Sequence, residues 1–403
     1  MQKQTYIIDG IRTAIGNFGG TLSKVRTDDL GAHVIRELVA RNPEVPLEAY
    51  EDVIFGCANQ AGEDNRNVAR MCSLLAGLPW SVPGETVNRL CSSGMSAAIH
   101  AHRAIQTGDG DVFISGGVEN MTRGPWVISK VSKPFGRDAQ MHDSSFGWRF
   151  INPKMEALYG TDGMGQTAEN LVEKYGLSRE AQDAYAYHSQ RKAAAARESG
   201  RLAKEITPIS IPRRKQEDLI FDQDEFLRPT TTTEVLAKLR PAFKKEGGSV
   251  TAGNASGLND GAGALLIASD SAVERYGLKP MARIVSSAVV GVEPRIMGIG
   301  PVQASNKALE KAGLTMEQMD IIEINEAFAA QVLACLQAWG LDAEDPRINP
   351  NGGAIAIGHP LGMTGSRILQ TAAIELHEQQ KQYALVTLCV GVGQGYATIL
   401  ERV

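Results

Sequence analysis

The feature that most constrains the fold of this chain is a weak internal repeat between its first and last parts. The segment EDVIFGCANQ (51–60) is echoed by MDIIEINEAF (319–328), because each has an acid, an apolar run and then a polar elbow. TVNRLCSSGMSAAI (86–99) and RINPNGGAIAIGHPLGMTGSRIL (347–369) are each followed by a helical pattern and an apolar strand. A duplicated half brings equivalent loops together near a pseudo-twofold axis. Residues that are distant in sequence are therefore expected to share one site.

Short apolar runs alternate with segments of helical period along most of the chain, which predicts α/β architecture. The predicted strands are 5–9, 52–55, 111–115, 263–268, 282–290, 320–324, 383–390 and 396–400. The predicted helices are 27–41, 93–106, 178–199, 301–312, 326–339 and 364–380. The stretch 121–248 is rich in charge, Pro and Thr, and its helical pieces lack a companion series of strands. We interpret it as an insertion laid over a core whose strands lie before and after it.

Charge and cysteine usage argue against several classes of protein. The net charge is −5 and no basic block is longer than Arg213–Lys215, which argues against nucleic acid as a partner. Five scattered cysteines without a C-x-x-C pair favour free thiols in a reducing compartment over a disulfide framework or a zinc site. No leader-like segment is present, and no apolar stretch approaches the ~18 residues of a membrane span. We therefore expect a soluble cytoplasmic protein without a membrane partner or a metal.

Cys91 stands just before a run with helical spacing, in VNRLCSSGMSAAIHA. A cysteine at the start of a helix faces unpaired backbone N–H groups and the positive end of the helix dipole, and both lower the pKa of a thiol. This position favours a nucleophilic thiolate. The alternative is a buried, inert cysteine, the usual fate of a lone Cys. The segment alone leaves both interpretations open.

His359 lies in GGAIAIGHPLGMTGSR, where five glycines surround it. The proline that follows restricts its backbone, so the imidazole is predicted to sit in a rigid, closely packed loop. Such a histidine suits general-base work on a thiol or hydrogen bonding to an oxyanion. A purely structural histidine is the alternative.

Three more segments place a polar side chain or a thiol at the end of a predicted strand or in a predicted turn. Cys389 ends an apolar strand in TLCVGVGQGYA, and its glycine-rich turn leads into another strand, so the turn is no dinucleotide fingerprint. The thiol is either an acid/base group beside oxyanion-binding N–H groups or a buried core cysteine. Asn325, in INEAFAAQ, is predicted either to cap the next helix or to orient a water or a carbonyl. Ser256, in GNASG, is a turn residue or a partner for an amide-bearing ligand.

Taken together, these segments resemble one family strongly, the thiolases. The matching strings are NRLCSSGMSAA, GNASGLNDGAGAL, NEAFAAQ, NPNGGAIAIGHPLGMTGSR and CVGVGQG, and the resemblance extends back to the opening DGIRTAIGNFGG. It implies a duplicated α/β/α fold with two similar halves, a five-layer core and an inserted loop domain. The implied division is 1–121 plus 249–272 for the first half, 122–248 for the loop domain that binds CoA and forms tetramers, and 273–403 for the second half.

The resemblance implies an acyltransferase with ping-pong chemistry and no cofactor, in which CoA is a substrate. Cys91 would become acylated after His359 takes its proton. Cys389 would be the second acid/base group. One oxyanion hole would combine His359 with a water held by Asn325, and the other would use the backbone N–H groups of Cys91 and Gly391.

The resemblance also implies the residues that bind CoA and a homo-oligomer. Ser256 matches a pantetheine-contacting serine, and Arg228 an adenine-side arginine. The apolar tunnel positions are matched by Met164, Phe243, Met297 and Phe328. Thiolases are usually dimers or dimers of dimers. The loop 124–138, with its apolar and basic residues, is a candidate for the tetramer-forming loop, and the sequence does not distinguish the two states.

Substrate choice within the family is narrowed by a few segments. Gly163 and Val235 replace a histidine and a serine of the short-chain biosynthetic members, whereas GCANQAGEDNRNVARM and SFGWRFINPKMEALYG resemble the 3-oxoadipyl-CoA thiolases of aromatic-acid degradation. That substrate ends in a carboxylate, for which Arg66 and Arg149 are candidates, although each is equally well a surface or interface arginine. The alternatives are an acetoacetyl-CoA thiolase, a 3-ketoacyl-CoA thiolase of fatty-acid β-oxidation, a β-ketoacyl synthase-like enzyme, and a non-catalytic thiolase-like protein that binds acyl-CoA or lipid.

Overall fold

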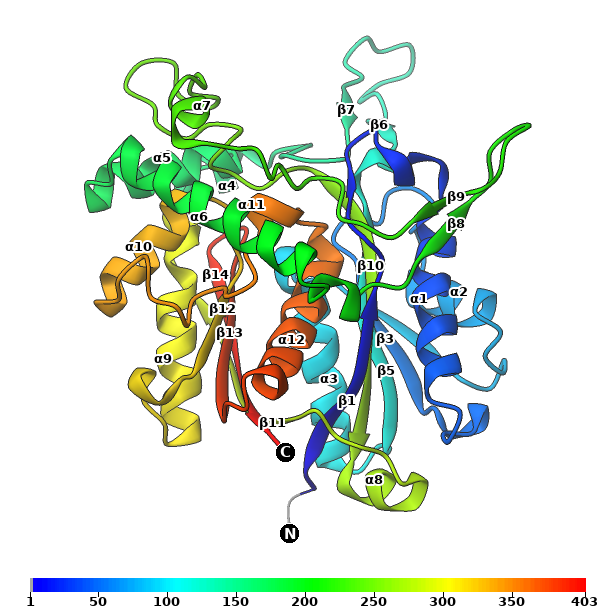
Figure 1. Cartoon of the computed structure of the whole chain (residues 1–403). Helices are drawn as coiled ribbons and strands as arrows, with labels where there is room; N and C mark the ends of the chain where they lie inside the picture. The colour runs from blue at the N-terminus through cyan, green and yellow to red at the C-terminus, as the bar shows by residue number, and fades with distance from the viewer. Residues whose placement is uncertain (1–2) are drawn as a thin grey trace.

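The computed structural model describes residues 3–403 as five layers of helices and sheet (Figure 1). The strands of the main sheet follow the order β12-β13-β14-β11-β1-β10-β5-β3-β4, and the short strand β2 (Gly16–Asn17) pairs with β10. The sheet turns around two central helices, α3 and α12, so that its two ends lie on opposite sides of them. Helices α1 and α2 cover one outer face, and α9 and α10 cover the other.

The first half of the sheet combines parallel and antiparallel pairs. Its strands are β1 (Thr5–Arg12), β3 (Asp52–Gly56), β4 (Gly84–Val87), β5 (Val112–Asn120) and β10 (Asn259–Ser269). Its helices are α1 (Thr27–Arg41), α2 (Val68–Leu75) and α3 (Ser93–Thr107), and α8 (Asp270–Tyr276) follows β10. Strands β4, β3 and β5 run parallel, whereas β10 is antiparallel to both β5 and β1.

The second half repeats this pattern. Its strands are β11 (Ala282–Gly291), β12 (Ile321–Ile324), β13 (Tyr383–Val390) and β14 (Gln394–Arg402), and its helices are α9 (Gly300–Ala312), α10 (Ala329–Trp339), α11 (Ala354–Ile357) and α12 (Leu361–Glu378). The order β11-β14-β13-β12 matches β1-β10-β5-β3, with the same parallel and antiparallel pairs. Even the β3–β4 pair has a counterpart, a parallel bridge between Ile322 and Ile348. The predicted internal repeat is confirmed.

The insertion lies over one end of this core (Figure 1). Its helices are α4 (Pro153–Tyr159), α5 (Met164–Tyr175), α6 (Arg179–Glu198) and α7 (Thr233–Ala237). The prediction that it lacks strands is wrong in detail, because it forms two short hairpins, β6 (Trp126–Ile128) with β7 (Met141–Asp143) and β8 (Ile209–Ile211) with β9 (Leu219–Phe221). The domain boundaries given above stay a prediction.

The predicted strands and helices of the core are all present, and most of them have shifted ends. Strand β5 runs on to Asn120 instead of ending at Ser115. Its extension contains Gly117, whose missing side chain leaves room for the backbone of Gly362. Helix α10 begins at Ala329 and not at Glu326, because Phe328 adopts an extended conformation as the N-cap.

Close approach of backbones holds the two halves together at the central helices. A Cβ on Gly94 of α3 would lie 2.7 Å from the carbonyl oxygen of Gly362 on α12, and Gly365 meets the backbone of Met95 in the same way. Apolar side chains of both helices share one core cluster with both ends of the sheet. Because residues 362–373 are buried without a break, α12 is enclosed on all sides.

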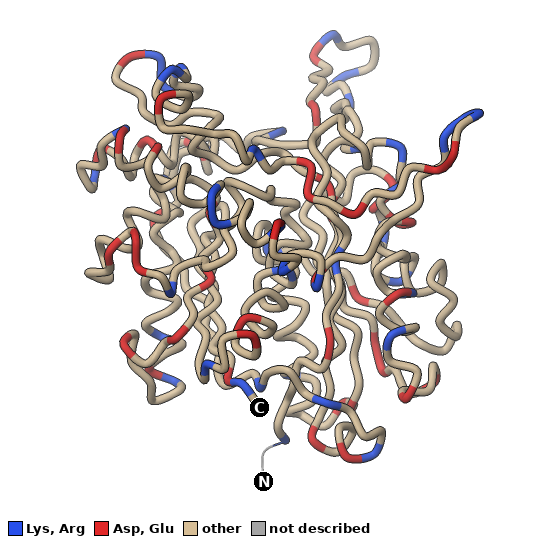
Figure 2. Tube along the Cα trace, viewed as in Figure 1, with Lys and Arg blue, Asp and Glu red and all other residues tan. Residues whose placement is uncertain are grey.

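Charged residues of both signs are spread over the outside of the molecule (Figure 2). The basic run Arg213–Lys215 lies in the loop of the projecting hairpin β8–β9. All five cysteines are free and buried, so the prediction of free thiols is confirmed. Among residues 3–403, no helix has the length and apolar character needed to cross a membrane.

Candidate active site

Cys91 lies in a single 3₁₀ turn (Leu90–Ser92) between β4 and the start of α3. The turn is held by Ser93, whose hydroxyl donates to the Leu90 carbonyl at 2.7 Å and accepts from the Arg89 N–H at 2.9 Å. The backbone N–H groups of Gly391 and of Cys91 itself act to lower the pKa of the thiol. Burial nevertheless raises the pKa of Cys91 to about 11. The predicted lowering of this pKa is therefore wrong, because loss of water outweighs the nearby N–H dipoles.

His359 is buried between α11 and α12, and its hydrogen bonds fix its tautomer. The Thr364 hydroxyl has one proton and donates it to the Pro360 carbonyl at 2.8 Å. It must therefore accept from Nδ1–H of His359, which lies 2.7 Å away, and Nε2 carries the free lone pair. Burial, followed by the positive charge of Arg367, lowers the pKa of His359 to about 3. The imidazole is neutral at pH 7 and is able to accept a proton at Nε2.

Asn325 follows β12 and faces His359, with its Nδ2 3.4 Å from Nε2. The predicted alternative that it caps the next helix is wrong, because that helix begins four residues later. Its backbone N–H instead donates to the carbonyl of Thr387 on β13 at 3.0 Å. Within residues 3–403 its buried Oδ1 has no hydrogen-bond donor, so it is available to a water or a ligand.

Cys389 lies on β13, opposite Gly395 of β14, and is fully buried. Burial, and then the proximity of Cys91, raise its pKa well above the usual value. The predicted hairpin is confirmed, since β14 begins directly after a turn in which Val392 has φ +60° and Gly393 φ +75°. The structure thus brings Cys91, Cys389 and Gly391 together.

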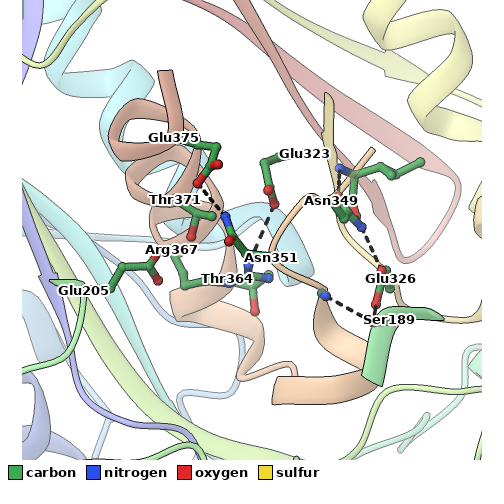
Figure 3. Close-up of polar contacts among 12 residues, drawn as sticks. Ser189, Glu205, Glu323, Glu326, Asn349, Asn351, Thr364, Arg367, Thr371 and Glu375 are labelled. Atoms are coloured by element: carbon green, nitrogen blue, oxygen red, sulfur yellow. Dashed lines mark hydrogen bonds and ion pairs between the residues drawn. The ribbon is translucent and has the colours of Figure 1, made fainter. Parts of the chain in front are cut away.

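Buried polar side chains of β12, α12, α6 and the segment before α11 form a network of contacts (Figure 3). Arg367 of α12 lies 4.0 Å from Glu323 of β12, and both side chains are buried. Glu326 accepts from the hydroxyls of Ser189 and Tyr185, at 2.6 and 3.0 Å, and from Asn349 Nδ2 at 2.8 Å. These bonds tie helix α6 of the insertion to the segment that leads to His359.

Sequence reasoning missed a buried carboxylate beside the catalytic loops. Glu119 of β5 accepts from the N–H groups of Ala58, Asn59 and Gly362 at 2.8–2.9 Å, and burial raises its pKa to about 7. It thereby joins a loop of the first half to the start of α12. Its signal in the sequence is an acid inside the otherwise apolar and glycine-rich run VFISGGVEN.

Several of the predicted CoA-side residues lie around Cys389. Met297 and Phe328 share a buried cluster with Cys389, and the ring of Phe243 lies edge-on to that of Phe328 with centroids 6.1 Å apart. Met164 begins α5 and lies close to Gly391.

The remaining predicted CoA contacts lie on loops. Ser256 donates to the carbonyl of Ala327 at 3.1 Å. Arg228 is exposed, and its backbone N–H donates to Gln190 on α6 at 2.8 Å. Within residues 3–403, no group of three or more His, Cys, Asp or Glu side chains is arranged to hold a metal ion.

The two arginines predicted for a substrate carboxylate have different surroundings. Arg66 is exposed, on a loop where it adopts φ +67°. Arg149 is half-buried and donates to the carbonyl of Ser144 at 3.3 Å and to Asn59 Oδ1 at 3.2 Å. A small pocket lies beside Val392, the residue that follows Gly391. Neither Arg66 nor Arg149 is among the residues that line it.

Family models identify the class of protein that this fold and site define. The model for the thiolase N-terminal domain matches residues 5–271, and that for the thiolase C-terminal domain matches residues 278–402. The chain belongs to the thiolase family and is an acyltransferase of that family.

Relatives and solved structures agree with this assignment over the whole chain. The chain is 56% identical over 401 residues to a beta-ketoadipyl-CoA thiolase of Acinetobacter baylyi and 55% identical to a 3-oxoadipyl-CoA/3-oxo-5,6-dehydrosuberyl-CoA thiolase of Escherichia coli, with 100% of each chain covered. The crystal structure of the Bacillus anthracis acetyl-CoA acetyltransferase is similar with a TM-score of 0.92 and 40% identity, covering 100% of this chain and 99% of that one.

Proposed function

We propose that this enzyme cleaves 3-oxoadipyl-CoA with CoA to give succinyl-CoA and acetyl-CoA. The observation that carries the proposal is the full-length identity of 55–56% to relatives whose names give this substrate. The identity to an acetyl-CoA acetyltransferase of the same fold is lower, at 40%, so acetoacetyl-CoA is the less favoured substrate.

The first half-reaction cleaves the carbon chain. The Cys91 sulfur attacks the C3 ketone while its proton passes to Nε2 of His359. The C2–C3 bond then breaks, leaving a succinyl thioester on Cys91 and the enolate of acetyl-CoA. Cys389 gives its proton to C2 of that enolate. A thiol with a raised pKa suits this role, because it holds its proton until a strongly basic carbanion forms.

The second half-reaction releases the acyl group. Acetyl-CoA leaves, and a second CoA thiol gives its proton to the Cys389 thiolate and attacks the thioester. The Cys91 sulfur is expelled and takes back the proton from Nε2 of His359, which gives succinyl-CoA and restores the enzyme. The backbone N–H groups of Cys91 and Gly391 would stabilise the oxyanion of each tetrahedral adduct, and both act to lower the pKa of the Cys91 thiol. The enolate oxygen would lie between His359, protonated at Nε2, and a water held by Asn325.

CoA would serve as a substrate and no cofactor would be needed. Ser256 and the apolar side chains near Cys389 would line the pantetheine path, with Arg228 on the adenine side. These apolar side chains are Met164, Phe243, Met297 and Phe328.

We also propose that the enzyme is a homodimer or homotetramer in the cytoplasm. The projecting hairpin β6–β7 exposes large apolar side chains, which favours burial against another copy of the chain. They are Trp126, Ile128, Phe135 and Met141. Sedimentation analysis would give the number of subunits.

The decisive experiment compares kcat/KM for 3-oxoadipyl-CoA, acetoacetyl-CoA and a medium-chain 3-ketoacyl-CoA. We expect the first to be highest, and Cys91→Ser to abolish cleavage of all three. A clear preference for the medium chain would contradict the substrate. If Cys91→Ser retained full thiolysis, the mechanism itself would be wrong, and a non-catalytic acyl-CoA-binding protein would show no thiolysis at all.

A further inference from the structure

A small pocket lies beside the β13–β14 turn, and one of the residues that line it is an arginine. Its wall contains Trp148, Asp162 and Met164 from the insertion, Arg295 from the 3₁₀ segment η6 (Pro294–Ile299), and Val392 from the β13–β14 turn. Val392 directly follows Gly391, whose backbone N–H acts to lower the pKa of the Cys91 thiol, and a Cβ on Gly391 would lie 3.9 Å from the Met164 sulfur. The pocket is therefore next to the place where an acyl group on Cys91 would lie.

Arg295 is held in a fixed orientation at this pocket. Its Nε donates to Asp162 Oδ2 at 3.0 Å, and the same oxygen accepts from Asn170 Nδ2 at 2.8 Å. Asn170 Nδ2 also donates to the Arg295 carbonyl at 2.8 Å. Gly160, at φ +74°, allows the aliphatic part of the arginine to lie along its backbone, where a Cβ would be 3.3 Å from Arg295 Cδ.

The two terminal nitrogens of this guanidinium are left for a ligand. Within residues 3–403 neither Nη1 nor Nη2 of Arg295 makes a hydrogen bond, and the side chain is 56% exposed. Asp162 accepts a hydrogen bond from Nε only. The N–H groups on Nη1 and Nη2, which can bind the two oxygens of a carboxylate, therefore remain free. Arg149 differs, because both of its Nη atoms are already bonded to Ser144 and Asn59.

The pocket wall also shows backbone strain. Val392 has φ +60°, a conformation that is costly for a β-branched residue and persists only where the surroundings enforce it. The turn thereby places an apolar side chain in the wall of the pocket that Arg295 also lines. An acyl tail with methylenes near the thioester and an anion at its end has the matching polarity.

We propose that Arg295 binds the terminal carboxylate of the acyl chain and thereby selects dicarboxylic 3-ketoacyl-CoA substrates. The inference rests on the proposed function and replaces Arg66 and Arg149 as the carboxylate-binding residue. In a succinyl thioester only three C–C bonds of about 1.5 Å separate the thioester carbon from the carboxylate carbon. The cation must therefore be close to Cys91, and Arg295 lines the same pocket as Val392, the residue that follows Gly391.

The test is the selectivity ratio, kcat/KM for 3-oxoadipyl-CoA divided by that for acetoacetyl-CoA, in the oligomeric enzyme. We expect Arg295→Gln to lower this ratio about 10- to 100-fold, as the loss of charged hydrogen bonds implies. Arg295→Lys keeps the charge without the paired N–H groups and should fall between wild type and Arg295→Gln. Arg213→Gln, on the exposed β8–β9 loop, is the matched control and should leave the ratio unchanged.

The outcomes separate this inference from the proposed function. A variant that merely damages the fold lowers both rates and leaves the ratio intact, which would overturn the role of Arg295. The role of Arg295 would also be overturned if Arg149→Gln lowered the ratio and Arg295→Gln did not. A wild-type enzyme that does not favour 3-oxoadipyl-CoA over acetoacetyl-CoA would instead overturn the proposed substrate.

Discussion

The two halves of the molecule share one topology but end their equivalent strands differently. The second-last residue of β5 is Glu119, which accepts hydrogen bonds from three backbone N–H groups, whereas the second-last residue of the equivalent strand β13 is Cys389, two residues before Gly391. In the proposed mechanism the first half contributes Cys91, and the second contributes His359, Asn325 and Cys389. A duplicated scaffold would then allow one copy to supply the nucleophile while the other supplies the acid/base groups.

The largest expected effect comes from removing the second thiol. Cys389→Ala should lower kcat for thiolysis about 10²- to 10⁴-fold, because the enolate loses its proton donor. Cys57→Ala is the matched control, since Cys57 is an equally buried cysteine at the end of β3 in the first half. Steady-state assays of both variants check this. A similar loss in Cys57→Ala would show that the halves do not divide the chemistry in this way.

The opposite pKa shifts of the nucleophile and its base give a second test. Below its pKa of about 11, the Cys91 thiolate fraction should rise tenfold per pH unit, so alkylation by iodoacetamide should be about 100-fold faster at pH 9 than at pH 7. His359, with a pKa of about 3, adds no step in this range. Mass spectrometry of the Cys91 peptide gives the rate. A plateau already reached at pH 8 would instead indicate a thiolate–imidazolium pair.

The contact between the halves is predicted to be intolerant of one methyl group. Gly94→Ala places a Cβ 2.7 Å from the Gly362 carbonyl, so we expect the free energy of unfolding to fall by about 1–3 kcal/mol. Gly163→Ala is the control, because a Cβ there meets no atom within 4 Å. Urea titrations compare the two. Equal stability would mean that α3 and α12 separate without cost.

The smallest expected effect concerns Thr364, a positioning residue that has no substrate contact. Thr364→Val removes the acceptor for Nδ1–H of His359 and should lower kcat about tenfold, whereas Thr364→Ser keeps the hydroxyl and should restore most of it. The tautomer itself is read from the ¹⁵N chemical shifts of His359. If the Ser and Val variants were equally slow, packing and not the hydrogen bond would be responsible.

The sequence predicted the framework well because strands, helices and elbows are local patterns. Helix α1 spans the predicted residues 27–41, and strand β13 the predicted 383–390. The electrostatics of the site were harder to predict, since they arise where the two halves meet. The pKa of Cys91 depends on burial by distant segments, and that of His359 on burial and then on the charge of Arg367, whose proximity follows from how α12 enters the core.

The enclosed position of α12 has a consequence for synthesis of the chain. Helix α3 ends at residue 107 and α12 begins at residue 361, so the ribosome must add 361 − 107 = 254 residues before α3 meets its partner. At about 5–20 residues per second, this takes on the order of 10–50 s. During that interval the nascent first half carries an uncovered face of small and apolar side chains. The step most exposed to aggregation, and to chaperone capture, is therefore the wait for α12.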